Sequence, residues 1–254
     1  PNNMAICLSG DFDPDQMIAT IDKYFGGLKP NPDLPKLDLP KETPITAPVV
    51  REILGPDAES DALAWRFPGA ADKDVETLQV VSQILYNGQA GLIDLDLTQQ
   101  QKTLSAYCYP MTMSDYSAFM MQGRPKQGQT LDEVKDLLLG ELKKLREGDF
   151  DEKMLEANIN NFKLYQMQQL ENNDARADMF VESFVNGSDW ADEVTALDRM
   201  SKLTKDDIVA FANKYLKDDN YAVIYKKQGK DPNEKKMSKP EITPIVMNRD
   251  TVST

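Results

Sequence analysis

Apolar residues recur with two different periods between residues 49 and 227 of this chain. Short runs rich in β-branched and aromatic residues predict strands at 49–54, 62–67, 104–111, 116–121 and 221–225. Apolar residues repeated every three or four positions predict helices at 75–85, 92–100, 131–145, 151–185, 190–200 and 205–215, the fourth broken near 172–173. This order predicts an α+β fold, a two-layer sandwich whose mainly antiparallel sheet is covered on one face by helices.

Capping residues support several of the predicted helix starts. Thr130 is followed three residues later by Glu133, which is the spacing of a capping box, and Thr204 precedes the last predicted helix. Asp13, followed by a proline and by Gln16, begins an earlier helix that ends at a pair of glycines. We therefore expect helices to begin at these three positions.

The pattern divides the chain into four parts. Residues 1–28 form a short strand-helix unit, and residues 29–48 carry six prolines without helical periodicity, which is typical of an extended linker. Residues 49–227 form the α+β domain, and residues 228–254 are expected to link it to a following domain. Because the chain begins with proline rather than methionine, we expect it to be part of a longer protein.

Residues 1–28 are too few to bury a core by themselves. Their apolar run over residues 4–10 predicts a buried strand, whose backbone donors need a partner strand. We therefore expect this unit to belong to a preceding domain. In the isolated chain it should dock on the main domain or pair with a second copy, giving a homodimer.

The composition is that of a soluble globular protein, with 41% hydrophobic and 28% charged residues. A formal net charge of −13 and a pI near 4.6 argue against nucleic acid or an anionic membrane as partner. No stretch has the length and apolarity of a membrane span, and no signal peptide is visible. Two cysteines, Cys7 and Cys108, exclude a disulfide-rich scaffold but leave one bridge open, so the sequence is compatible with a reducing compartment and with an exported parent protein.

The chain contains no histidine. Histidine is the commonest metal ligand and the one side chain whose ordinary pKa lies near neutrality. Its absence excludes Ser–His and Cys–His nucleophile pairs and zinc sites anchored by histidine. We therefore assign no catalytic residue and no metal ligand, and we expect the chain not to hydrolyse a substrate by itself.

Carboxylates are the remaining candidates for acid–base chemistry. Asp94 and Asp96 lie in one predicted helix, and Glu152 and Glu156 lie four residues apart on one face of another. Helical carboxylates on a protein surface usually serve only to solvate it. We favour that interpretation for all four.

Two further groups of side chains have a functional and a structural interpretation. Asp57, Glu59 and Asp61 alternate as calcium ligands do, but the central glycine and terminal glutamate of an EF-hand are missing, which favours an acidic turn. The methionines in and between two predicted strands are candidates for an adaptable peptide groove, although burial in the core is the favoured interpretation. They are Met111, Met113, Met120 and Met121.

A series of passages along the chain has the order known from one family. The first comprises Pro1-Asn2-Asn3-Met4, Ser9-Gly10-Asp11-Phe12-Asp13 and Tyr24-Phe25-Gly26-Gly27-Leu28. The others are Gln83-Ile84-Leu85, Asn87-Gly88, Gly91-Leu92, Leu104-Ser105-Ala106-Tyr107, Glu147-Gly148 and Leu203-Thr204-Lys205-Asp206-Asp207-Ile208. Over most of residues 1–227 the chain thus resembles the insulinase-like (pitrilysin-type) zinc peptidases.

The resemblance implies a role without catalysis. The chemistry of that family depends on zinc held by an H-x-x-E-H motif and a downstream glutamate, which a chain without histidine does not contain. The resemblance therefore implies a non-catalytic domain that forms part of a chamber wall, while zinc is bound elsewhere in a full-length metallopeptidase. The implied partners are a peptide or unfolded polypeptide substrate and the catalytic domain of the same chain or of a partner subunit.

The resemblance also implies one site residue. The substrate-contacting arginine and tyrosine of the family match the stretch from Leu97 to Tyr107. Tyr107 stands at the place of the tyrosine, and Gln100 stands nearest the place of the arginine. We name Tyr107 as the candidate substrate contact, with packing within a strand as its alternative role.

Three functions follow from these observations. The first is the non-catalytic, chamber-forming domain of a zinc metallopeptidase, and the second is a binding or structural homologue whose full chain also lacks zinc. The third is an unrelated α+β hydrolase that works with carboxylates, for which the sequence offers no positive evidence. An H-x-x-E-H motif about one domain upstream would separate the first two, and chelator-resistant activity of this chain would favour the third.

Overall fold

Five strands form one sheet in the computed structural model, which describes residues 1–35, 40–232, 238–240 and 242. They are β1 (Val49–Gly55), β2 (Ser60–Pro68), β3 (Ser105–Met111), β4 (Tyr116–Arg124) and β5 (Tyr221–Gln228). The strands lie side by side in the order β1–β5–β2–β4–β3. Only β1 and β5 are parallel, so the prediction of a mainly antiparallel sheet is confirmed.

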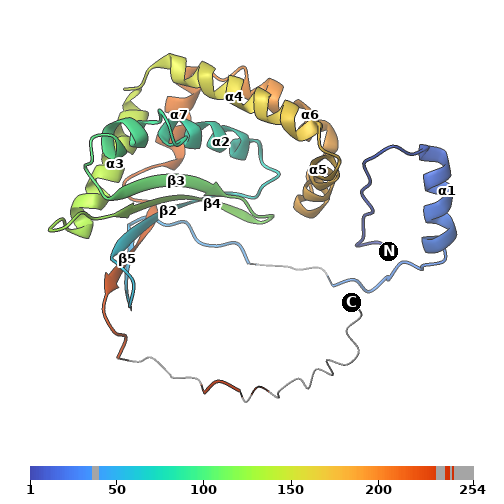
Figure 1. Cartoon of the computed structure of the whole chain (residues 1–254), viewed down its shortest axis with the longest axis horizontal. Coiled ribbons are helices and arrows are strands. Elements are labelled where there is room, and N and C mark those ends of the chain that lie inside the picture. Colours follow the sequence, from blue (N-terminus) through green and yellow to red (C-terminus); the bar gives the residue numbers. More distant parts are fainter. Residues whose placement is uncertain (36–39, 233–237, 241, 243–254) are drawn as a thin grey trace, which may run out of the picture.

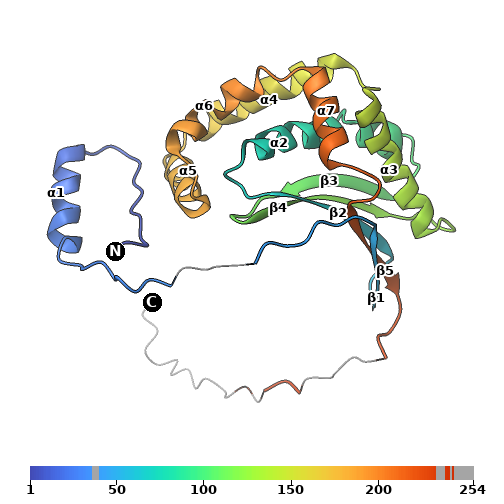
Figure 2. The same ribbon diagram turned by 180° about the vertical axis from the view of Figure 1, so that it is seen from behind.

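Helices cover one face of this sheet (Figure 1, Figure 2). They are α2 (Lys73–Leu85), α3 (Leu131–Glu147), α4 (Glu152–Leu170), α5 (Asn173–Asn186), α6 (Trp190–Met200) and α7 (Lys205–Tyr215), while α1 (Pro14–Phe25) lies apart from the sheet. In the described part of the chain no helix lies against the opposite face, which we call the open face. The predicted two-layer α+β architecture is therefore confirmed.

The hydrophobic core lies between the sheet and its helices. In β2 the alternate residues Leu63, Trp65 and Phe67 are buried, and Trp65 Nε1 donates a hydrogen bond of 3.0 Å to the backbone oxygen of Lys217. The apolar stripes expected on α2 and α3 are buried against these strands. Their members are Val75, Leu78, Val81, Leu85, Leu131, Val134, Leu138, Leu142 and Leu145.

The predicted helix caps are present. Thr130 Oγ1 accepts from the backbone N–H of Glu133 at 3.2 Å, and Glu133 Oε2 accepts from that of Thr130 at 2.7 Å, completing a capping box. Thr204 caps α7 in the same way, and Asp13 caps α1. The break expected near residues 172–173 separates α4 from α5, where the Asn172 side chain caps the new helix.

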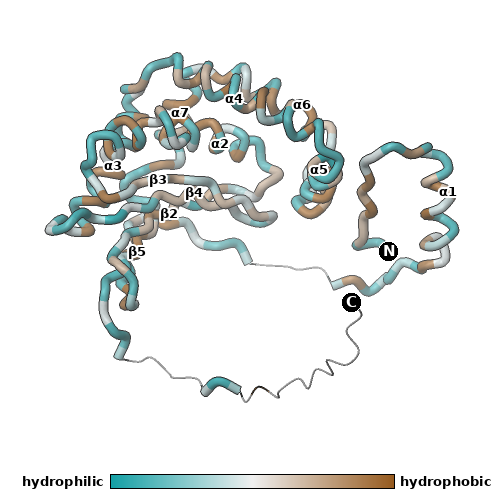
Figure 3. Tube along the Cα trace, in the orientation of Figure 1, coloured by the Kyte–Doolittle hydropathy of each residue, from teal (hydrophilic) through white to brown (hydrophobic). Residues whose placement is uncertain are grey.

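One local prediction is wrong. Residues 4–10 form no strand, and Met4, Ile6 and Leu8 are exposed, because no described segment pairs with their backbone. This apolar stretch is the brown segment before α1 in Figure 3. The short helix expected over 92–100 is present over 92–98, and most of it is a π-helical turn, η1 (Asp94–Thr98), closed by a hydrogen bond of 2.8 Å from the Gln99 N–H to the Asp94 carbonyl oxygen.

The N-terminal unit approaches the main domain at α5. Ser9 Oγ lies 3.3 Å from Asn173 Oδ1, within hydrogen-bonding distance, and Ser9 lines a mainly apolar cavity of about 450 Å³ together with Phe180 and Trp190. None of the described helices combines the length and apolarity needed to cross a membrane. The proposed domain boundaries stay predictions, and much of the 228–254 linker lies outside the described residues.

Candidate functional site

Tyr107, the residue singled out from the sequence, lies on the open face of the sheet. Its neighbours in β3, Ala106 and Cys108, are buried on the helix side, so the alternation of a strand directs Tyr107 and Tyr109 to the other side. Both tyrosines remain partly accessible, because no described helix covers this face. Tyr107 is thus placed where an outside molecule can reach it.

A single glutamine fixes the hydroxyl groups of both tyrosines. Gln122 lies directly opposite Tyr107 in β4. The Tyr107 hydroxyl donates to Gln122 Oε1 at 2.5 Å, and Gln122 Nε2 donates to the Tyr109 oxygen at 3.1 Å. The amide therefore holds two phenols in defined orientations, which makes them preformed hydrogen-bonding groups for a ligand.

The aromatic rings continue this arrangement along the edge strand. The ring centroids of Tyr107 and Tyr109 are 6.2 Å apart with planes inclined by 18°, and the ring of Tyr86, the residue after α2, has its centroid 6.2 Å from that of Tyr107. Such rings offer apolar faces beside polar tips, a combination suited to peptide contacts. The sequence analysis missed both Tyr109, which has the same alternating phase as Tyr107 in the predicted strand 104–111, and Gln122, which follows the predicted strand 116–121 and is placed opposite Tyr107 only by the strand register.

Gln100 does not belong to this network. Its side chain is exposed and its Nε2 donates to Asp96 Oδ1 at 3.4 Å. Gln100, which stands nearest the place of the family's arginine, is therefore neutral and donates to a nearby carboxylate.

The two aspartates proposed as acid–base candidates are engaged in structural contacts. Asp94 is buried, and its Oδ2 accepts hydrogen bonds of 3.0, 3.1 and 3.0 Å from the backbone N–H groups of Asn87, Gly88 and Gly91. One carboxylate oxygen thereby satisfies three donors of a tight loop. Asp96 Oδ2 instead pairs with Lys144 Nζ at 2.6 Å.

Lys144 joins Asp96 to a buried acid, Glu141. The distance from Lys144 Nζ to Glu141 Oε1 is 3.0 Å. Burial raises the pKa of Glu141, and the hydrogen bond from Lys144 opposes that effect. Glu152 and Glu156 are exposed on α4, separate from this group, so the four candidate carboxylates do not form one site.

The alternating acids near β2 also separate in space. Asp57 is exposed, whereas Asp61 is buried on the helix side of the sheet and neither of its carboxylate oxygens has a hydrogen-bond partner. Burial raises the pKa of Asp61 to about 7. Among the residues that the structure describes, no three His, Cys, Asp or Glu side chains are grouped to hold a metal ion, so this part of the chain does not fit a zinc site.

Only one of the four candidate methionines is packed in the core. Met121 is fully buried and Met120 is half-buried on the open face. The core assignment is wrong for Met111 and Met113, which are 41% and 51% exposed. Met111 has the open-face phase of β3, and Met113 lies in the turn before β4, so no helix covers either side chain.

Comparison with known proteins gives this fold a family. A family model described as peptidase M16 inactive domain matches residues 1–162. The chain belongs to this family. Membership confirms the resemblance to insulinase-like zinc peptidases that the sequence passages carry.

Individual relatives agree with this assignment. A zinc protease of Helicobacter pylori, PqqE, is 24% identical over 233 residues, which make up 89% of this chain and 52% of that protein. The crystal structure of a protease from the same organism matches 86% of this chain and 53% of its own with a TM-score of 0.78 and 21% identity. The crystal structure of the peptidase M16 inactive domain from Pseudomonas fluorescens matches 87% of this chain and 52% of its own, with a TM-score of 0.73 and 16% identity. The chain thus spans about half the length of the curated relative it matches.

Proposed function

We propose that this chain is the non-catalytic half of a zinc-dependent metallopeptidase and contributes a substrate-contacting wall to its chamber. The observation that carries the proposal is the open sheet face with Tyr107 and Tyr109 held by Gln122. A face of preoriented phenols next to exposed methionine suits a polypeptide chain, whose backbone offers donors and acceptors at regular intervals.

The hydrolytic step belongs to another part of the assembly in this proposal. The chain has no histidine, and its two cysteines, Cys7 and Cys108, are both unpaired. Burial raises the pKa of the Cys108 thiol far above its ordinary value, which keeps it protonated and unreactive. Zinc and the groups that activate water would come from a catalytic domain of the same protein or from a partner subunit.

An exported parent protein is part of the proposal. One structural neighbour is described as the periplasmic protease PqqL from Escherichia coli, with a TM-score of 0.65 over 85% of this chain. An exported parent is consistent with that likeness. Fractionation of the source cells with an antibody against this chain would test it.

Peptide hydrolysis by the parent protein tests the proposed function. We expect cleavage of an unstructured peptide by the assembly of this chain with its catalytic half, loss of that cleavage with a chelator, and none by this chain alone. Tyr107→Phe in the assembly should raise KM, because it removes a hydroxyl oxygen that can accept a hydrogen bond from the substrate, together with the bond that orients Gln122, without emptying the space. Absence of metal and of cleavage in the parent would overturn the proposal in favour of a binding or structural homologue.

A further inference from the structure

The open face of the sheet has a charge pattern opposite to that of the whole chain. Strand register places side chains in rows across the sheet, and the row of Tyr107 continues through Gln122, Ala62, Ile224 and Arg51. Residues two positions away along each strand share the same face. We call these alternate positions the open-face phase of each strand. Every charged residue of the five strands that has this phase is basic.

Four strands each contribute one of these cations. They are Arg51 of β1, Arg66 of β2, Arg124 of β4 and Lys226 of β5. No strand residue with the open-face phase is Asp or Glu, although the chain has a net charge of −13. A basic face on an acidic protein is a local feature that the overall charge conceals.

The acidic residues of the same strands point to the helix side of the sheet. Glu52 and Asp61, the acidic residues within the strands, both have the helix-side phase. Lys227 shares that phase and pairs with Glu52 at 2.7 Å. Alternation thus separates the acids of the sheet from four of its five bases.

The four cations of the open face are not neutralised within the described part of the chain. None of them forms an ion pair there, and those with hydrogen bonds donate to backbone oxygens. Arg66 donates to the Thr43 oxygen at 3.0 Å and lies over the Tyr116 ring at 5.5 Å. Their positive charge is therefore available to a ligand.

The shape of the face suits an extended main chain. Small side chains occupy its middle, where Ala62, Ala64, Ala118 and Ala222 share the open-face phase on three neighbouring strands. Larger tyrosine and methionine side chains stand on the β3 side. A backbone can approach the sheet over the alanines while its side chains reach the surrounding rings and cations.

We infer that the open face binds polypeptide segments rich in Asp and Glu, so that acidic stretches are the substrate class this wall selects. This inference rests on the proposed function and names its substrate. Four cations without a carboxylate partner, spread over the same face as the tyrosines, recognise carboxylates that are spaced along a peptide. A nucleic acid is disfavoured, because a long uniform polyanion would extend past this face onto an acidic protein.

Binding by the intact chain tests the inference. The probes are one dye-labelled unstructured peptide rich in Glu and Tyr, the same peptide with Gln in place of Glu, and a single-stranded oligonucleotide, followed by fluorescence anisotropy. We expect the Glu peptide to bind at least about tenfold more tightly than the Gln peptide, with an affinity that falls as salt rises. Equal binding of the two peptides, or tighter binding of the oligonucleotide, would overturn the inference.

Matched charge variants locate the binding surface. Arg51→Gln with Arg124→Gln removes two exposed cations from the open face and should weaken the Glu peptide by about tenfold. The control, Lys163→Gln with Lys202→Gln, removes two exposed cations from the helical side and should leave binding nearly unchanged. Equal losses in both variants would show a general charge effect and contradict the assignment. Arg66→Gln removes a third cation from the open face and should also weaken binding of the Glu peptide.

The peptidase assembly separates this inference from the proposed function. If the chain promotes cleavage equally for the Glu and Gln peptides, the substrate class is wrong while the chamber role stands. If the chain promotes no cleavage but still binds the Glu peptide through Arg51 and Arg124, the chamber role is wrong while the binding face stands.

Discussion

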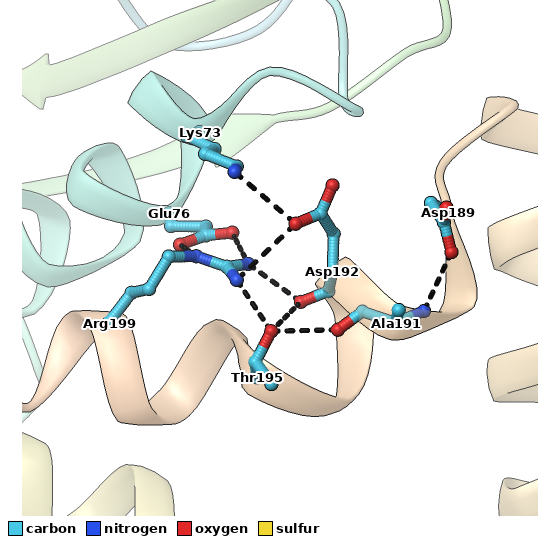
Figure 4. Close-up of polar contacts among 7 residues, drawn as sticks. All are labelled: Lys73, Glu76, Asp189, Ala191, Asp192, Thr195 and Arg199. Atoms are coloured by element: carbon cyan, nitrogen blue, oxygen red, sulfur yellow. Dashed lines mark hydrogen bonds and ion pairs between the residues drawn. The ribbon is translucent and has the colours of Figure 1, made fainter.

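Arg199 and Glu76 face one another through two hydrogen bonds that join α6 to the start of α2 (Figure 4). Arg199 Nε donates to Glu76 Oε2 at 2.9 Å, and Arg199 Nη2 donates to Glu76 Oε1 at 2.5 Å. The same guanidinium reaches Thr195 Oγ1 at 2.6 Å and the Asp192 carbonyl oxygen at 2.6 Å. This contact fastens the outer helices to the helix that packs on the sheet.

Replacing Arg199 by lysine should destabilise the fold despite keeping the charge. A single ammonium cannot reproduce the paired geometry of a guanidinium with a carboxylate. We expect Arg199→Lys and Glu76→Gln each to lower the free energy of unfolding by about 1–2 kcal/mol, measured by urea denaturation. The double variant should lose less than the sum, since both changes break the same contact.

The exposed pair Lys143–Glu147 is the control for that experiment. Its atoms are 3.8 Å apart and both side chains are more than half exposed. Lys143→Gln should therefore change stability by less than about 0.5 kcal/mol. A loss as large as that of Arg199→Lys would contradict the assignment of the Arg199→Lys effect to the paired geometry.

Asp94→Ala should release the loop that follows α2. The change removes the acceptor shared by the N–H groups of Asn87, Gly88 and Gly91. Because these donors then lack a partner in partly buried or, for Gly91, buried surroundings, we expect a loss of about 1–3 kcal/mol and faster amide exchange at the three residues. Asp96→Ala, which breaks a partly exposed ion pair with Lys144 and an exposed hydrogen bond from Gln100, should cost less and leave exchange in the loop unchanged.

Asp61 makes stability fall as the pH rises. Its pKa is about 7 in the folded protein and 3.8 is its ordinary value, so the folded state binds more protons between these two values. The stabilising effect of the neutral form is complete below about pH 4 and is lost as the pH rises through 7. Wild type should therefore lose on the order of 2–4 kcal/mol from this group between pH 4 and pH 8.

Asp61→Asn keeps the shape of the side chain and removes its charge. Urea denaturation at several pH values should show that the variant lacks most of this decline and is the more stable protein at pH 8. Parallel pH profiles for wild type and Asp61→Asn would contradict the assignment of the decline to this carboxyl group.

Tyr107→Phe should affect ligand binding more than stability. The loss of the bond to Gln122 on a partly exposed face should cost less than about 1 kcal/mol in unfolding. Binding of a peptide to the open face should weaken by roughly threefold to tenfold. Tyr165→Phe, on the exposed surface of α4, serves as the control and should leave both quantities unchanged.

Local signals in the sequence predicted most of the fold, because the interactions behind them are local. Thr130 and Glu133 are three residues apart, and the capping box they form needs no distant partner. The segment from Met4 to Gly10 has equally strong strand composition, yet it forms no strand, since pairing depends on a neighbour that composition does not encode.

The candidate site likewise depends partly on contacts between distant residues that the sequence does not reveal. Tyr107 was reached through a resemblance, whereas its bond to Gln122 depends on the register of β3 with β4. Met111 and Met121 have identical chemistry and differ only in the face they occupy, which is fixed by where the helices pack. The basic open face likewise becomes visible only when five separate strands are aligned.

The place of β5 in the sheet bears on how the protein is synthesised. Of the five described strands, β5 comes last in chain order, yet it sits between β1 and β2, with Val49 paired to Ala222. A nascent chain that has not reached residue 221 leaves β1 without its partner and β2 with an open edge, even though all the preceding described helices have already been synthesised. A translational pause or a premature stop ahead of β5 would therefore release a polypeptide that presents adhesive strand edges to chaperones and to other unfinished copies of itself.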